Sequence, residues 1–184
     1  MTRTKSVSES VVIGADPLVV YEQISDPRNY GRWSPENVGA TLLAGAPTGS
    51  YEGMEFNGHN RNNRRLRGAW NLAMPRWTTR CVVTAAEPSK RFAFAVVGQM
   101  MGGKEKPRLP FGIATWEYRL DELEGGTRLT ETWTDDRDSS LFGRASRMAD
   151  RVFSGGPTFP EFQKRNMRTT LDRIKSDLEG ISRE

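Results

Sequence analysis

The feature that most constrains this chain is a pair of alternating segments joined by a glycine-rich turn. Residues 115–123 read TWEYRLDEL and residues 127–133 read TRLTETW, with EGG between them. Side chains on a β-strand point alternately to opposite faces, so this period-two pattern predicts two half-buried strands. The glycines permit the tight reversal that an antiparallel hairpin needs. The hairpin favours an antiparallel sheet.

The predicted inward face of the second arm carries a carboxylate. That face contains Leu129, Glu131 and Trp133, and the opposite face contains Arg128, Thr130 and Thr132. A carboxylate on an apolar face is partly desolvated, so it either finds a hydrogen-bond donor or has a raised pKa. Glu131 could then accept a hydrogen bond from a ligand hydroxyl, or act as a general acid or base. The alternative is that a bulge or a strand edge turns Glu131 to solvent, or that it pairs with a structural arginine.

Other segments complete an order of strands and helices. Strand-like runs occupy residues 6–13, 38–43, 51–59, 77–86, 91–98, 113–121 and 127–134. After the first run, Asp16 as N-cap and Pro17 at the first helical position begin a short helix that stops at Asp26. A second short helix over 27–33 would hold Tyr30 and Trp33.

The C-terminal segment has the strongest helical pattern. Thr158 and Glu161 have the spacing of a capping box, and Gly180 offers a stop. Apolar residues follow at near-helical spacing: Phe159, Phe162, Met167, Leu171, Ile174 and Leu178. Before this helix, residues 99–112 form a loop rich in glycine, proline and lysine, and residues 135–157 contain an amphipathic helical pattern.

This order predicts an α+β fold, because antiparallel strands with segregated helices do not form a parallel doubly wound sheet. We expect a curved antiparallel sheet of about six or seven strands around a long C-terminal helix, with two short helices after the first strand. A chain of 184 residues is most economically a single domain over 1–184.

Composition excludes several classes of protein. No apolar run approaches the roughly 20 residues that span a bilayer, and the N-terminus lacks the apolar stretch of a secretory signal. The one cysteine, Cys81, cannot form an internal disulfide, which fits the cytoplasm. The net charge is only +4, and the basic stretch at 61–68 lacks interleaved aromatic residues, so nucleic acid is not an expected partner. That stretch is interpreted as a solvated hairpin, or alternatively as a docking patch for an acidic carrier protein.

Common catalytic and metal-binding patterns are missing from the sequence. His59, the one histidine, falls on the polar face of its strand, and Cys81 is interpreted as a small buried apolar residue. A single histidine and a single cysteine give no metal-ligand spacing, and the glycines near 98–104 form no phosphate-binding loop. We expect neither a metal nor a cofactor.

Four segments together resemble the START/Bet v 1-like superfamily, and within it the bacterial polyketide cyclase/dehydrase-like proteins. They are residues 16–36, 53–61, 87–96 and 115–133. The resemblance implies a helix-grip fold with a deep pocket between the sheet and the C-terminal helix. Members hold lipids, sterols, polyketides, quinones or plant hormones there, and some are enzymes. Fold alone does not choose among these, and no family catalytic residue is carried over.

The leading hypothesis is the binding of a small hydrophobic or amphipathic ligand, such as a lipid, a polyketide or a quinone, with an opening near residues 99–112. The expected ligand-binding residues are Tyr30, Trp33, Phe56, Phe94, Trp116, Tyr118, Glu131, Trp133, Phe162, Met167 and Leu171. The alternative is a polyketide aromatase/cyclase or dehydratase, with Glu131, Tyr118 and Tyr30 as candidate proton-transfer groups. A third hypothesis is a protein-interaction module without a ligand. The sequence leaves the oligomeric state open.

Overall fold

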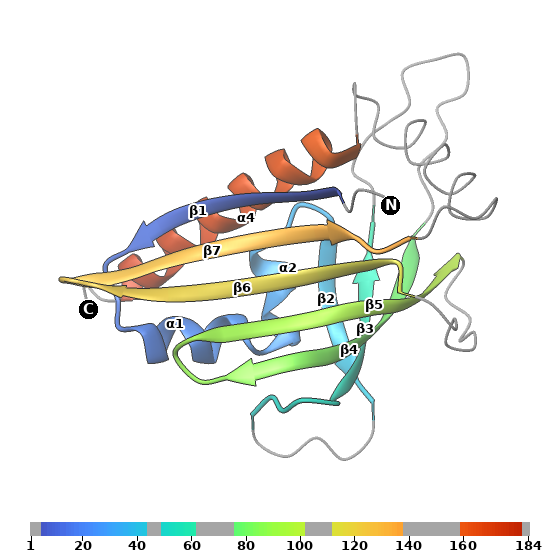
Figure 1. Ribbon diagram of the computed structural model, residues 1–184, viewed down its shortest axis with the longest axis horizontal. Coiled ribbons are helices and arrows are strands. Elements are labelled where there is room, and N and C mark those ends of the chain that lie inside the picture. The colour runs from blue at the N-terminus through green and yellow to red at the C-terminus, as the bar shows by residue number, and fades with distance from the viewer. Residues whose placement is uncertain (1–4, 44–48, 62–75, 102–111, 138–158, 182–184) are drawn as a thin grey trace.

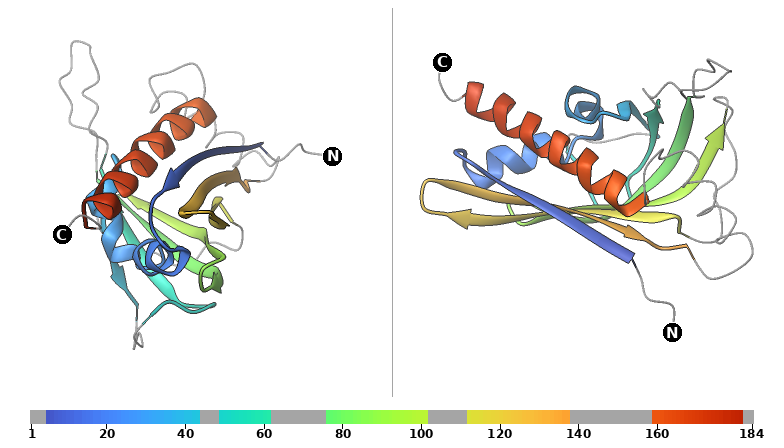
Figure 2. Two further views of the ribbon diagram at one scale, coloured as in Figure 1. Left: turned by 90° about the vertical axis from the view of Figure 1, so that its left-hand side faces the viewer. Right: turned by 90° about the horizontal axis from the view of Figure 1, so that it is seen from above.

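The fold is a curved antiparallel sheet that grips a long helix (Figures 1 and 2). The computed structural model describes residues 5–43, 49–61, 76–101, 112–137 and 159–181. Within them, seven strands form one sheet in the order β1-β7-β6-β5-β4-β3-β2, and every neighbouring pair is antiparallel. The expected helix-grip α+β architecture is confirmed.

The strands follow the alternating runs of the sequence closely. Their bounds are β1 Lys5–Ile13, β2 Asn37–Leu42, β3 Glu55–Asn60, β4 Trp77–Glu87, β5 Arg91–Met101, β6 Ala114–Leu123 and β7 Gly126–Asp135. Between β6 and β7, Gly125 has φ +79°, a left-handed conformation that glycine adopts at little cost. The predicted hairpin is therefore present, and its alternation sets which side chains face inward.

Two short helical segments follow β1, as the sequence predicted. Helix α1 (Pro17–Ile24) begins at Asp16, whose carboxylate accepts a hydrogen bond from the backbone N–H of Leu18 at 2.7 Å. The 3₁₀ turn η1 (Pro27–Asn29) and helix α2 (Tyr30–Trp33) come next, and the Asp26 carboxylate caps η1 in the same way. These turns carry Tyr30 and Trp33 into the interior.

The long C-terminal helix α4 (Phe159–Ile181) lies across the concave side of the sheet and packs against β1, β7 and α2 (Figure 2). Its inward face is apolar along most of its length: the buried apolar residues are Phe162, Met167, Leu171, Ile174 and Leu178. The right-handed twist of the strands curls the sheet toward this helix. A concave sheet closed on one side by a helix encloses a core.

The structure corrects three boundaries. Residues 51–54 form a turn rather than the start of a strand, because Gly53 has φ +87° and the ladder of β3 begins only at Glu55. Strand β5 continues to Met101, into the predicted loop, because its last residues pair with β4. Gly180 lies inside α4 and does not stop it.

Other predictions fall outside the described residues. These are most of the basic stretch 61–68, residues 102–111 of the predicted loop, the amphipathic pattern from residue 138 onward, and Thr158 of the capping box.

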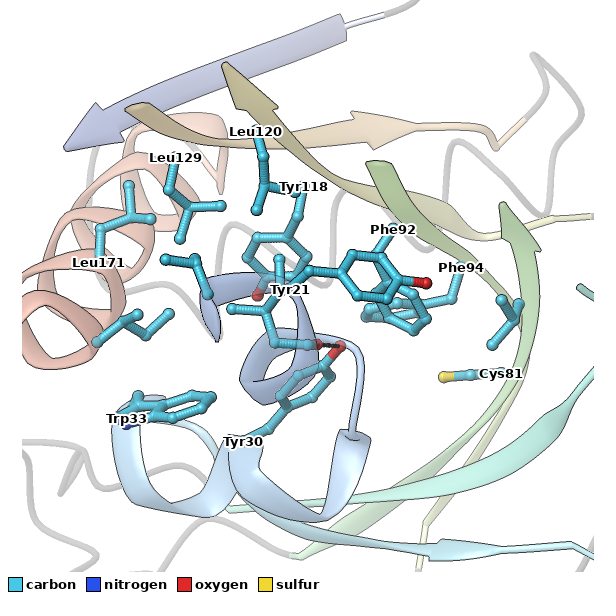
Figure 3. Close-up of a cluster of buried hydrophobic side chains, with 14 of the residues drawn as sticks. Tyr21, Tyr30, Trp33, Cys81, Phe92, Phe94, Tyr118, Leu120, Leu129 and Leu171 are labelled. Atoms are coloured by element: carbon cyan, nitrogen blue, oxygen red, sulfur yellow. Dashed lines mark hydrogen bonds between the residues drawn. The ribbon is translucent and has the colours of Figure 1, made fainter. Parts of the chain in front are cut away.

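The core lies between the sheet, α1, α2 and the second half of α4 (Figure 3). Among its fully buried side chains are Trp33, Phe56, Phe92, Leu129, Leu171 and Ile174. Figure 3 shows Phe94 and Tyr118 from the sheet beside Tyr30 of α2, and Trp33 farther along the same helix. Burial of such side chains stabilises a fold by roughly 1.5–3 kcal/mol each.

Two glycines give a matched test of this packing. A Cβ added at Gly126, where β7 begins, would lie inside contact distance of the Ile13 carbonyl oxygen, whereas a Cβ at Gly180 meets nothing within 4 Å. We expect Gly126→Ala to lower the free energy of unfolding by about 1–3 kcal/mol. Gly180→Ala should raise it by up to about 1 kcal/mol, because alanine favours helix. Urea unfolding of both variants measures this; equal stabilities would contradict the close approach of β1 to β7.

Candidate functional site

A cavity of about 240 Å³ lies between the sheet and the first half of α4. Strands β3 to β7, α2 and α4 all contribute to its wall. The structure brings most of the predicted ligand-binding residues together there: Tyr30, Phe56, Phe94, Trp116, Tyr118, Glu131, Trp133, Phe162 and Met167 line it. Because the wall is mainly apolar, the cavity has the character of a small-molecule pocket.

Two predicted residues lie elsewhere. Trp33 packs in the core, and its indole N–H donates to the Asp177 carboxylate at 2.8 Å. Leu171 belongs to the same core cluster. The physical reason is the position of α4: its first half faces the cavity, and its second half packs on the core formed with α1 and α2. Helical spacing alone gives an inward face but not the point at which the cavity ends.

Glu131 lies inside, as the strand pattern predicted, with 2 % of its surface exposed. It stands directly opposite Tyr118 in the β6–β7 ladder, and the tyrosine hydroxyl donates to Glu131 Oε1 at 2.8 Å. Side chains opposite each other on antiparallel strands are close enough for such a bond. Glu131 lines the cavity, and its other carboxyl oxygen, Oε2, is buried and has no hydrogen-bond partner among the described residues.

Burial dominates the ionisation of this pair. It raises the pKa of Glu131 from 4.5 to about 8, and the Tyr118 hydrogen bond offsets only part of that effect. The pKa of Tyr118 is raised well above 10, first by burial and then by the nearby Glu131 charge. Near neutral pH the carboxyl group therefore keeps its proton, and Glu131 Oε2 can offer an O–H to a ligand.

A second carboxylate faces Glu131 from β1. Glu9 is its direct partner in the β1–β7 ladder, but α4 covers Glu9 with two cations, Lys164 at 3.4 Å and Arg168 at 3.0 Å. Two opposed carboxylates destabilise a ladder when both are charged. Here Glu9 has cationic partners and Glu131 is protonated, so the repulsion is avoided.

Aromatic side chains form one wall of the cavity beside Glu131. Tyr30 stacks on Phe94 with ring centroids 5.9 Å apart, and Phe56 meets Phe94 edge-on at 5.2 Å. The Tyr30 hydroxyl donates to the Ile24 carbonyl at 3.0 Å, as Figure 3 shows, so its proton is already engaged with the backbone. Tyr30 is therefore a poor candidate for proton transfer, whereas the Tyr118 hydroxyl contacts the Glu131 carboxyl group directly.

Sequence reasoning missed a polar strip on α4. Gln163, Asn166 and Thr170 line the cavity beside Phe162 and Met167. Gln163 Oε1 and Asn166 Nδ2 are buried and have no hydrogen-bond partner among the described residues. The signal was present: these polar residues recur at helical spacing on the face that also carries the apolar residues.

The cavity also approaches a buried ion pair. Arg137 contributes to its wall, and the guanidinium donates to Asp135 Oδ1 at 2.8 Å and to Oδ2 at 3.0 Å. Both side chains are 6 % exposed. Arg137 is the one lysine or arginine among the described lining residues, and this pairing neutralises it.

The remaining reactive side chains lie as the sequence predicted. Cys81 is buried in the cavity wall, and burial raises the pKa of its thiol to about 12, which suppresses the nucleophilic thiolate. His59 lies on the other face of β3 and hydrogen-bonds Thr41 at 2.8 Å. Over the described ranges, no group of three histidine, cysteine or acidic residues is arranged to hold a metal ion. No helix in those ranges is long and apolar enough to cross a membrane.

The chain matches one known protein family, and many solved structures share its fold. The family model described as polyketide cyclase/dehydrase and lipid transport matches residues 4–179. No curated protein matches the chain. The Polyketide_cyc-like protein of Corynebacterium glutamicum is 25 % identical, with 97 % of this chain and 94 % of that chain covered and a TM-score of 0.53.

Two further solved structures share the fold. A START superfamily protein from Mycobacterium smegmatis is 13 % identical, covers 96 % of this chain and 98 % of its own, and has a TM-score of 0.59. The ZhuI aromatase/cyclase from a Streptomyces species is 17 % identical, with 96 % and 94 % covered and a TM-score of 0.55. At these identities the likeness extends to the fold alone.

Proposed function

Since the chain belongs to the polyketide cyclase/dehydrase and lipid transport family, we propose that it binds one small amphipathic ligand in the cavity between the sheet and α4. The observation that carries the proposal is the buried Glu131–Tyr118 pair on an otherwise largely apolar wall. Apolar burial supplies affinity at roughly 25 cal/mol per Å², and a few polar groups fix the orientation. Without a ligand group or a water molecule beside it, Glu131 Oε2 would stay unsatisfied at a cost of about 1–3 kcal/mol.

Three tryptophans of the cavity wall provide the readout: Trp77, Trp116 and Trp133. Titration with hydroxylated naphthalenes or quinones should quench tryptophan emission saturably, and native mass spectrometry should show a complex with one ligand per chain. A panel of such ligands that produces neither quenching nor a thermal shift contradicts the proposal. In that case the interaction-module hypothesis gains support.

A variant that fills the cavity should weaken ligand binding strongly. Ala114 lies on the cavity wall, in one buried cluster with Trp133 and Met167, and is 6 % exposed. We expect Ala114→Phe to weaken ligand binding at least about tenfold, because the ring would take the space that the ligand needs. Thr130→Phe, on the outer face of β7, is the control and should bind normally. Isothermal titration measures both, with circular dichroism to show that each variant folds.

The second candidate function is an aromatase/cyclase or dehydratase reaction. It is favoured by the position of Glu131, which is buried on the cavity wall. Burial raises the pKa of this carboxyl group to about 8, close to the working range of a general acid. Glu131 would donate this proton to a ligand oxygen, and Tyr118 would hold the carboxyl group in position. Glu131→Gln separates the two functions, because an amide keeps a hydrogen-bond donor but cannot release a proton. A binding protein keeps its affinity in this variant; an enzyme keeps affinity and loses turnover.

Other parts of the proposal rest on the sequence. We retain a single domain over residues 1–184 and the cytoplasm as the place of action, the latter because Cys81 has no disulfide partner in the chain. An acidic carrier protein that docks on residues 61–68 would suit the cyclase function. Charge reversal in that stretch, followed by binding to a purified acyl carrier protein, tests it.

A further inference from the structure

We infer that Gln163 and Asn166 on α4 are specificity determinants that recognise a hydroxyl and a carbonyl group of the ligand, and that the cavity as a whole prefers such an uncharged ligand to a carboxylate. This inference rests on the proposed binding function. It concerns which chemistry the cavity recognises, and it assigns that recognition to the helix as well as to the sheet.

Buried polar atoms without hydrogen-bond partners are concentrated around the cavity. In the described part of the chain, three buried side-chain polar atoms have no hydrogen-bond partner: Glu131 Oε2, Gln163 Oε1 and Asn166 Nδ2. All three residues line the cavity described above. Unpaired buried polar groups are rare in native proteins, because each costs the desolvation of a group that water would otherwise satisfy. Their concentration around one cavity points to a ligand that supplies the missing partners.

The unpaired atoms include both hydrogen-bond acceptors and donors. Gln163 Oε1 accepts, so its partner on the ligand is a hydroxyl or another donor. Asn166 Nδ2 donates, so its partner is a carbonyl, ether or hydroxyl oxygen. Glu131, when protonated, adds another donor for a ligand oxygen. A purely aliphatic ligand would leave all of these groups unsatisfied.

The charges on the cavity wall disfavour an anionic ligand. A carboxylate ligand needs a cation or several donors to compensate for its desolvation. Among the described lining residues the one basic side chain is Arg137, and its guanidinium is occupied by Asp135 inside the protein. Glu131 would also repel an anion whenever it loses its proton. The wall is therefore built for a neutral ligand.

Four two-ring probes of similar shape test the inference by isothermal titration at pH 7: 6-acetyl-2-naphthol, 2-acetylnaphthalene, 2-ethylnaphthalene and 6-hydroxy-2-naphthoate. We expect the hydroxy ketone to bind at least about tenfold more tightly than the ketone without the hydroxyl, and more tightly still than the ethyl compound. The carboxylate should bind at least about tenfold more weakly than the hydroxy ketone. Each step corresponds to one hydrogen bond or one uncompensated charge.

Variants assign the preference to residues. Gln163→Met keeps the side-chain length and should reduce the advantage of the hydroxyl to less than about threefold. Asn166→Leu should weaken both ketones by about fivefold or more and leave 2-ethylnaphthalene unchanged. Asp172→Leu, on the exposed face of α4, is the control and should bind every probe normally. Thermal melting should show that Gln163→Met is at least as stable as the wild type, because it removes an unpaired buried oxygen.

The outcomes are distinct. Equal affinity of all three neutral probes in the wild type and in both variants overturns the inference and leaves the proposed function standing. Tightest binding of the carboxylate overturns it as well. Failure of all four probes to bind contradicts the proposed function and the inference together.

Discussion

Glu131→Gln is expected to make the protein more stable at alkaline pH and to leave its stability nearly unchanged at pH 4. In the folded state the pKa of Glu131 is about 8, against 4.5 for an unperturbed glutamate. Between these values the unfolded chain loses the proton while the folded protein keeps it, so the stability of the wild type falls as the pH rises from about 4.5 to 8. The loss is complete above the folded pKa and is on the order of 5 kcal/mol. Glutamine does not titrate, so the variant does not lose this stability as the pH rises.

Urea unfolding of both proteins from pH 4.5 to 9 measures the effect as the difference between their free energies of unfolding. Taking the difference between the two proteins cancels the contributions of groups that titrate equally in both. Glu122→Gln, the same substitution at an exposed position on β6, is the matched control variant. A flat difference for Glu131→Gln would mean that the carboxyl group ionises normally. A variant less stable at high pH would mean that a cation compensates the buried charge.

Leu171→Ala is expected to lower the free energy of unfolding by about 2–5 kcal/mol. Leu171 is 1 % exposed and belongs to the core cluster that joins α4 to the sheet, α1 and α2. Removing its side chain loses the transfer free energy of three carbons and leaves a void in a packed region. Urea unfolding at 25 °C measures the change. Leu18→Ala is the control: Leu18 is 46 % exposed on α1, so its truncation should cost no more than about 0.5 kcal/mol.

The same variant also tests the boundary between core and cavity. Leu171 is absent from the described cavity wall, whereas Met167, one turn earlier, is part of it. Folded Leu171→Ala at low temperature should bind 6-acetyl-2-naphthol within about threefold of the wild type. A large loss of affinity with retained fold would return Leu171 to the ligand site, where the sequence pattern had placed it.

Local patterns in the sequence were sufficient to locate the strands, apart from the boundaries at residues 51–54 and at the end of β5, and to assign the inward face of β7. The alternation over β6 and β7 determined that Leu129, Glu131 and Trp133 face inward, because a strand has only two faces and one is clearly more apolar. The capping aspartates determined where α1 and η1 begin, because the partners of those side chains are backbone N–H groups two residues away. Both are short-range effects that the local sequence contains.

The tertiary structure decided what these inward-facing residues do. The strand pattern placed Glu131 inside, but only the pairing of β6 with β7 put the Tyr118 hydroxyl 2.8 Å from its carboxyl group. The helical pattern of α4 identified an inward face, but the packing of the helix against the sheet, α1 and α2 decided that Met167 borders the cavity and that Leu171 belongs to the packed core. The polar residues Gln163 and Asn166 became candidate ligand contacts only when the curvature of the sheet left space opposite them. Each of these outcomes depends on contacts between segments far apart in the chain, and a local pattern contains no information about such distances.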